Sequence, residues 1–337
     1  MDSVRFGIIG CGSVTEVKSG PAFQKVPGSS LEMVMRRDAD KLKDYAMRHQ
    51  VPRYSTDYLD VLRDPDINAV YVATPPDTHA FYTMEAARYG KAVYVEKPMA
   101  RTVAECEAMV RACRDARVPL FVAYYRRGQP KFLKAKELLT LGMLGQPRSF
   151  TYLYACPPPD VDPDRPWLLE KEKAGGGLLY DVGSHMIDTI IYLMGDPLEV
   201  VGRSANLSGK HGTDDMSSAL FRFSCGAQGV MQLSFSAAQK ADQLLISGSR
   251  AGMTLSIMSN DPIRVEQDGK ITCFEFEHLP HVQQPYIEKV VRSLQGRESL
   301  DASGKDGLKT QEILEAIDLS KEWRKPVKGR ADDTHTV

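Results

Sequence analysis

The feature that most constrains the fold is an apolar segment near the start of the chain that leads directly into closely spaced glycines. Residues 4–10 are rich in valine and isoleucine, which is typical of a strand buried in a parallel sheet. Gly10 and Gly12 follow it, and such glycines allow a tight turn and a close approach of the backbone to a pyrophosphate. Thr15 replaces the third glycine of the usual fingerprint, which serves mainly helix packing. We expect a dinucleotide at this turn rather than a glycine-rich turn without a ligand, with contacts to Gly10, Gly12, Ser13 and Val14.

The segments that follow alternate between strand and helix. Short apolar runs at residues 31–35, 69–73, 92–95 and 120–123 are separated by stretches with helical periodicity. One of these helices, predicted over residues 102–116, begins with Thr102 and Glu105 in the spacing of a capping box. This alternation predicts a doubly wound parallel sheet, the Rossmann arrangement.

The pattern changes after about residue 124. Alternating strand-like segments fill residues 199–276, and helices are predicted at residues 130–142, 177–194, 283–294 and 303–323. Since 337 residues exceed the length over which one core usually grows, we expect two domains. The prediction is an α/β protein with a Rossmann domain over residues 1–123. An α+β domain with a large, open, mostly antiparallel sheet follows over residues 124–337.

Charge and cysteine content narrow the possible ligands. The formal net charge of −1 gives no overall field that would attract nucleic acid or a membrane surface, and no segment is long and apolar enough to cross a bilayer. The six cysteines lack metal-ligand spacing, so we expect no metal. The sequence thus predicts a cytoplasmic protein whose partner is a small molecule.

Two arginines follow the second predicted strand, where a dinucleotide-binding fold usually carries a carboxylate for the adenosine ribose. Arg36 and Arg37 come directly after Met35. Guanidinium groups at this place can hold a 2′-phosphate by charge-assisted bonds, which favours NADP over NAD. In the alternative interpretation, the arginines are solvated and Asp38 binds the ribose.

Three polar residues in two segments have the chemistry for hydride transfer at a carbon that bears a hydroxyl. Lys97 lies in a Glu96-Lys97-Pro98 segment at the carboxyl end of the fourth long strand, the edge where ligands bind in such folds. Asp181 and His185 lie four residues apart in a predicted helix, so one face carries both. An unperturbed imidazole titrates near pH 6.5 and can exchange the hydroxyl proton near neutrality.

With these segments the sequence resembles the Gfo/Idh/MocA family of oxidoreductases over essentially its whole length. The resembling features are the first strand with its glycines, residues 73–76 with His79, residues 96–98, the Arg126-Arg127 pair and residues 175–188. The resemblance implies that Lys97 contacts the reacting hydroxyl and that His185 is the general acid/base. It also implies that Asp181 contacts substrate or orients His185.

The resemblance carries further expectations about ligands and assembly. It implies a cis Lys97-Pro98 bond, sugars or cyclitols as substrates, and a second-domain sheet that is used to form a homodimer or homotetramer. The expected cofactor contacts beyond the turn and the arginines are Thr74, Pro75, His79, Glu96 and Lys97. The expected substrate contacts are Lys97, Tyr125, Arg126, Trp167, Asp181 and His185.

Departures from the family leave the substrate open. Tyr125 stands where a small or amide residue is frequent, and Leu168 stands where a basic residue is frequent. The proline-rich loop at residues 156–167 forms either a pocket wall or a solvent loop. Alternative functions are an aryl-diol or tetrapyrrole oxidoreductase of the same fold and a non-catalytic sensor of dinucleotides. Lys97, Asp181 and His185 together favour a polyol substrate, but the natural substrate and the reaction direction stay open.

Overall fold

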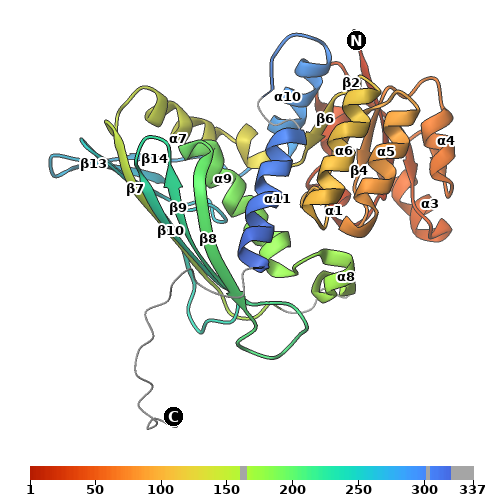
Figure 1. The fold of residues 1–337 in the computed structure, drawn as a ribbon. Coiled ribbons are helices and arrows are strands. Elements are labelled where there is room, and N and C mark those ends of the chain that lie inside the picture. Colours follow the sequence, from red (N-terminus) through yellow and green to blue (C-terminus); the bar gives the residue numbers. More distant parts are fainter. Residues whose placement is uncertain (160–164, 301–303, 320–337) are drawn as a thin grey trace.

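The glycine-rich turn follows β1, the first strand of the chain, which lies in the interior of a six-stranded parallel sheet. The computed structural model (Figure 1) describes residues 1–159, 165–300 and 304–319. In strand order β3-β2-β1-β4-β5-β6, every pair is parallel, which confirms the predicted doubly wound sheet. The strands are β1 (Val4–Ile9), β2 (Ser29–Met35), β3 (Arg53–Ser55), β4 (Ala69–Val72), β5 (Ala92–Val95) and β6 (Leu120–Val122).

Helices bury both faces of this sheet. Strands β4 and β5 both read Ala-Val-Tyr-Val and are buried at every position. Their tyrosines, Tyr71 and Tyr94, pack in one core with α2 (Gly20–Lys25) and α3 (Ala39–Arg48). Their valines face the opposite way, toward α4 (Tyr58–Arg63), α5 (His79–Arg88) and α6 (Val103–Asp115). Because successive residues of a strand point to opposite faces, each strand contributes to two cores.

Helix α6 begins with the predicted cap in a modified form. The Thr102 hydroxyl accepts a hydrogen bond from the Glu105 amide at 3.2 Å. The Glu105 carboxylate reaches back to the Arg101 amide at 2.9 Å, one residue before the usual position of a capping box. The two hydrogen bonds still satisfy backbone amides near the start of the helix.

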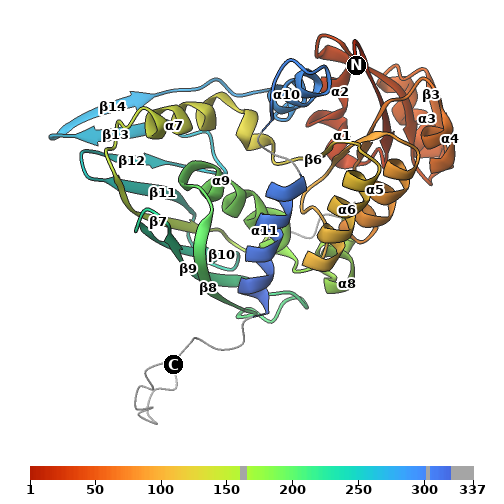
Figure 2. The ribbon, with the colours of Figure 1, turned by 45° about the horizontal axis from the view of Figure 1, so that its top comes forward.

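The second sheet has eight strands in the order β14-β13-β12-β11-β7-β10-β9-β8. Among the described strands only β7 and β10 pair in parallel, which confirms the mostly antiparallel prediction. Figure 2 shows α7, α9 and α11 against one face of this sheet. The strands are β7 (Pro147–Ala155), β8 (Pro197–Ala205), β9 (Met216–Phe223), β10 (Gln228–Ser234), β11 (Ala241–Gly248), β12 (Gly252–Leu255), β13 (Ile263–Gln267) and β14 (Lys270–Phe274). The helices are α7 (Pro130–Thr140), α9 (Ser184–Met194) and α11 (Gly304–Asp318).

Two late helices connect the halves of the chain. Helix α10 (Gln284–Leu294) packs its apolar face into the core of the first sheet, although it follows the second sheet in sequence. Helix α11 contacts α6 and β6 on one side and α9 and β8 on the other. The division at residues 123 and 124 stays a prediction, and the expected continuation of the last helix to residue 323 lies outside the described residues.

A buried ion pair joins the segment after β6 to the second sheet's helices. Arg127, in the short helix η2 (Tyr125–Gly128), donates from Nε and Nη2 to the Asp188 carboxylate of α9, at 2.8 Å for Nη2. Asp306 of α11 lies 3.5 Å from Arg127 Nη1. Removal of one partner would leave the other charge buried and unpaired, which is costly. The ion pair therefore stabilises the packing of η2 against α9 and α11.

No helix within the described ranges combines the length and apolar character needed to span a bilayer.

Candidate active site

The two glycines of the turn have different structural demands. Gly10 has a φ of +94°, and a Cβ built there would lie 2.8 Å from the Thr74 amide nitrogen. Gly12 has an ordinary φ of −112°, and a Cβ there would meet only the Gly10 carbonyl oxygen, at 4.0 Å. The protein itself therefore requires glycine at position 10, whereas the space beside Gly12 is open for a ligand.

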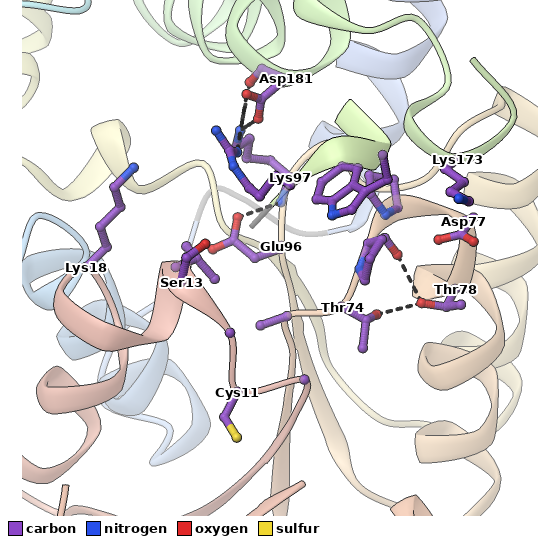
Figure 3. A pocket seen from close by; sticks show the side chains of 18 of the residues that line it. Cys11, Ser13, Lys18, Thr74, Asp77, Thr78, Glu96, Lys97, Lys173 and Asp181 are labelled. Carbon is purple, nitrogen blue, oxygen red and sulfur yellow. Dashed lines mark hydrogen bonds and ion pairs between the residues drawn. The ribbon is translucent and has the colours of Figure 1, made fainter. Parts of the chain in front are cut away.

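This turn lies at the edge of a cavity of about 1090 Å³. Figure 3 shows Cys11 and Ser13 of the turn on one side, with Glu96, Lys97 and Asp181 above them. The cavity lies at the carboxyl ends of the parallel strands, where ligands bind in doubly wound folds. Fourteen predicted site residues line it: Gly10, Gly12, Ser13, Val14, Arg36, Arg37, Thr74, Pro75, Glu96, Lys97, Tyr125, Trp167, Asp181 and His185.

The arginines after β2 line the cavity and the following aspartate has another role. Strand β2 ends at Met35, and Arg36 Nη1 donates to the Cys11 carbonyl oxygen at 3.1 Å. Arg37 lies beside it in the lining. Asp38 caps helix α3, because its carboxylate accepts the Lys41 amide at 3.0 Å. The residue that could pair with ribose hydroxyls is thus used for a helix cap.

Two predicted contacts lie behind the cavity wall. His79 is buried, with its ring nitrogens 2.7 Å from the Thr74 carbonyl oxygen and 3.0 Å from that of Pro98. Arg126 is buried as well, and its Nε donates to the Ile257 carbonyl oxygen at 3.0 Å. Neither residue lines the large cavity. The place of His79 fits support of the wall, whereas Arg126 lines a second, smaller cavity of about 280 Å³.

Lys97 and Asp181 meet although 84 positions separate them. The Lys97-Pro98 bond is cis, as expected. Lys97 Nζ donates to Asp181 Oδ1 at 2.5 Å and to the Asp181 carbonyl oxygen at 2.7 Å, and Arg165 Nη1 lies 3.5 Å from Oδ2. Burial acts to raise the pKa of Asp181, but the positive charges of Lys97 and Arg165 outweigh it, and the pKa lies below its ordinary value. The Asp181 carboxylate therefore fixes the position of the Lys97 ammonium group.

His185 lies in α9 on the same cavity and differs from the sequence-based expectation. Within the described chain neither ring nitrogen has a hydrogen-bond partner, and Nδ1 is fully enclosed. Burial, together with the positive charges of Arg126, Lys97 and Lys18, holds the pKa of His185 well below 6.5. The expectation of an unperturbed imidazole was wrong for this state of the protein. Asp181 binds Lys97 and makes no hydrogen bond with His185.

A buried hydrogen-bond network fixes the strand end that carries Lys97. The Glu96 carboxylate accepts bonds from the Tyr71 hydroxyl at 2.5 Å, the Gln283 side-chain amide at 2.7 Å and the Lys97 backbone amide at 3.1 Å. The Tyr94 hydroxyl in turn donates to Gln283 at 2.9 Å. Gln283 also lines the cavity, and no signal in the sequence separates it from an ordinary polar residue at a helix start.

The described part of the proline-rich loop forms one wall of the cavity. Arg165, Pro166 and Trp167 all line it, and helix α8 (Lys171–Ala174) follows directly. Residues 160–164 of this loop lie outside the described residues. Lys18, at the end of α1 (Ser13–Val17), also lines the cavity and was missed, because a single lysine at a helix end has no distinctive sequence pattern.

Comparison with known proteins establishes the family. Residues 4–124 match the oxidoreductase family with an NAD-binding Rossmann fold, and residues 132–254 match the GFO/IDH/MocA C-terminal domain. The chain is similar to oxidoreductase P35 of Formosa agariphila, at 36% identity over 298 residues that cover 86% of this chain and 90% of the relative. The chain belongs to the Gfo/Idh/MocA family. It is therefore an NAD(P)-dependent oxidoreductase, as the sequence predicted.

Other Gfo/Idh/MocA relatives have assigned substrates. Myo-inositol 2-dehydrogenase of Thermotoga maritima is 25% identical over 338 residues, which cover 96% of this chain and 98% of that protein. The crystal structure of aldose-aldose oxidoreductase from Caulobacter crescentus, complexed with glycerol, superposes with a TM-score of 0.82 at 29% identity. That match covers 94% of this chain and 96% of the other.

The residues of this Gfo/Idh/MocA protein fit a nicotinamide dinucleotide. The open space at Gly12 and the amides at the start of α1 suit a pyrophosphate. Arg36 and Arg37 lie at one end of the cavity lining, and Lys97, Asp181 and His185 lie together beyond the turn. The cavity volume of about 1090 Å³ lies near the upper end of the range of small-ligand pockets, about 300–1,000 Å³.

Proposed function

We propose that this protein is an NADP-preferring oxidoreductase that interconverts an alcohol and a ketone on a sugar or cyclitol. One observation carries the proposal. A single cavity places the Lys97-Asp181 pair and His185 at one region and the glycine turn with two arginines at another. This arrangement provides a dinucleotide cradle and a place for a hydroxyl next to a cation and a neutral base.

Side chains of the protein transfer the hydroxyl proton and stabilise the negative charge that develops on the substrate oxygen. The nicotinamide, when bound, takes or gives the hydride. Lys97 donates a hydrogen bond to the substrate oxygen and stabilises its negative charge as that oxygen loses its proton. The depressed pKa favours the neutral form of His185, so the imidazole can accept the hydroxyl proton in alcohol oxidation. Ketone reduction is the reverse step: it starts from the protonated imidazole, which gives its proton to the substrate oxygen and becomes neutral. Asp181 holds Lys97 in place.

The preference for NADP follows from the end of β2. Arg36 and Arg37 offer guanidinium groups to a 2′-phosphate, and Asp38 is engaged as the cap of α3. A free carboxylate there would repel that phosphate and bind ribose hydroxyls instead. The arginine pair therefore supports NADP.

The proposal of a sugar or cyclitol substrate is supported by the relatives and by the polar residues of the site. One relative is named for myo-inositol and a structural neighbour for aldoses. Lys97, Asp181 and His185 present a donor, an acceptor and a base, which suit a ring with several hydroxyls.

Absorbance of reduced nicotinamide tests the function directly. NADP and NAD, and their reduced forms, are each combined with a panel of sugars, cyclitols and ketosugars, with aryl diols and linear tetrapyrroles as separate arms. Turnover of a sugar or cyclitol with a lower KM for NADP supports the proposal. Turnover confined to an aryl diol or tetrapyrrole, or cofactor binding without turnover of any compound, contradicts it.

We also propose that the protein forms a homodimer or homotetramer through the open face of the second sheet. Leu245, Thr151, Val230 and Leu220 stand opposite one another on neighbouring strands and share that face. The three apolar side chains among them, Leu245, Val230 and Leu220, are at least 39% exposed. Exposed apolar side chains gathered on one face of neighbouring strands are typical of a protein interface. Sedimentation of the wild type and of a Val230→Lys, Leu220→Lys variant tests this, and a wild-type monomer contradicts it.

A further inference from the structure

The region around Lys97 carries more positive than negative charge. Lys18, Lys97 and Arg165 line this part of the cavity, with Asp181 and Glu96 as the carboxylates. Both carboxylates are engaged, Asp181 by Lys97 and Glu96 by the network of Tyr71 and Gln283. An anion that enters this region meets cations, while both carboxylates already interact with hydrogen-bond donors of the protein.

Of the three cations Lys18, Lys97 and Arg165, Lys18 has the fewest interaction partners. Within the described part of the chain its ammonium group has no hydrogen-bond or ion-pair partner, and its side chain is exposed. Lys18 lines the same cavity as Asp181 and His185. Figure 3 shows Lys18 and Lys173 on opposite sides of the view, with Lys97 and Asp181 between them.

The backbone of Lys18 is fixed in the same frame as Lys97. The Gln283 amide donates to the Lys18 carbonyl oxygen at 3.2 Å, and the Gln283 side chain bonds Glu96 at 2.7 Å. His281 adds a contact of 2.7 Å between its Nδ1 and the neighbouring Val17 carbonyl oxygen. Residues 281–283 therefore fix the position of the Lys18 backbone relative to the end of β5, where Lys97 lies.

Lys18 lies at the opposite end of α1 from the expected position of the pyrophosphate. The pyrophosphate is expected at Gly12 and the first amides of α1, whereas Lys18 follows the last residue of that helix. At 1.5 Å per residue, Ser13 and Lys18 are about 7.5 Å apart along the helix axis. The backbone of Lys18 thus lies away from the phosphate end of α1.

We propose that the substrate is a sugar acid and that Lys18 binds its carboxylate. This inference rests on the proposed function and narrows its substrate class. The reacting hydroxyl lies at Lys97 and His185, and the carboxylate on another carbon of the same molecule forms a charge-assisted hydrogen bond with Lys18. Removal of such a bond lowers kcat/KM for the acid about ten- to hundredfold.

Matched acid and neutral substrates test this proposal. Kinetics with NADP compare D-glucuronate with D-glucose and D-galacturonate with D-galactose, for the wild type, Lys18→Gln and Lys18→Arg. Lys173→Gln is the control, because Lys173 lines the other side of the same cavity and pairs with Glu170. We expect the wild type to favour the acids, Lys18→Gln to lose that preference, and Lys18→Arg and Lys173→Gln to retain it.

Binding without turnover separates this inference from the proposed function. Calorimetry measures methyl β-D-glucuronide and methyl β-D-glucoside on the NADPH complex of the wild type and of Lys18→Gln. If no sugar is turned over, the proposed function fails, while binding of the acid that depends on Lys18 still supports the contact between Lys18 and the carboxylate. Equal preference for acid and neutral sugar, or an acid preference that Lys18→Gln leaves unchanged, overturns it. So does a Lys18→Gln variant that weakens NADPH binding and both sugars alike.

Discussion

The two glycines of the cofactor turn should respond in opposite ways to the same substitution. Gly10→Ala places a side chain at a φ of +94° and within 3.0 Å of Thr74. Strained backbone costs about 1–3 kcal/mol and overpacking about 1–3 kcal/mol more, so we expect the free energy of unfolding to fall by about 2–6 kcal/mol. Gly12→Ala has an allowed φ of −112° and open space, so the unliganded protein should keep its stability within about 0.5 kcal/mol.

The effect on the cofactor should be the reverse. A methyl group at Gly12 occupies the space expected for the pyrophosphate, and overpacking of about 1–3 kcal/mol corresponds to a Kd for NADPH about 5- to 150-fold higher. Urea unfolding without cofactor and fluorescence titration with NADPH measure the two quantities. The reasoning is refuted if Gly12→Ala destabilises the unliganded protein as much as Gly10→Ala does, or if it binds NADPH within twofold of the wild type.

Three further predictions concern the charges of the cavity. Arg36→Asp with Arg37→Ala should reverse the ratio of KM values for NADP and NAD, and equal affinities in the unaltered protein would contradict the role of the arginines. Lys97→Ala should abolish turnover and leave the Kd for NADPH within about tenfold, as steady-state kinetics and fluorescence titration can show; a parallel loss of both would make Lys97 a cofactor or structural residue. His79 and His185 are buried with pKa values below 6.5, so the unfolded chain binds protons that the folded chain does not. The free energy of unfolding should therefore be steady above about pH 7 and fall below about pH 6.5 by up to about 1.4 kcal/mol per pH unit for each histidine. Urea unfolding at about pH 7.5 and pH 5.5 measures this, and a smaller loss in a folded His185→Asn variant should identify one contribution.

The first sheet was predictable because its strands carry their own signal. A segment buried on both faces must be apolar at every position, and β4 and β5 meet that demand with the same four residues. Helix α10 illustrates the limit of such patterns. Its sequence shows an apolar face, but periodicity does not tell which sheet covers that face, and the helix packs on the first sheet after the chain has completed the second.

Site residues at strand ends were predictable from the sequence. Site residues positioned by contacts between distant parts of the sequence were less so. Lys97 follows β5, so its place at the ligand-binding edge comes from local sequence. Gln283 reaches Glu96 across 187 positions, and Lys18 is held by Gln283 across an even longer separation. Such contacts depend on the packing of α10 against the first sheet, which the sequence did not indicate.

The relation between Asp181 and His185 shows how one irregular turn changes the chemistry. Spacing of four residues predicts a shared face only in a regular α-helix. Residues Leu179–Gly183 instead form a π-helical turn before α9, which is wider than an α-helical turn and alters the register between the two side chains. Asp181 can then meet Lys97, while His185 stays buried without a carboxylate partner among the described residues. The carboxylate therefore serves to fix a cation, and the imidazole is left neutral and able to accept the substrate proton.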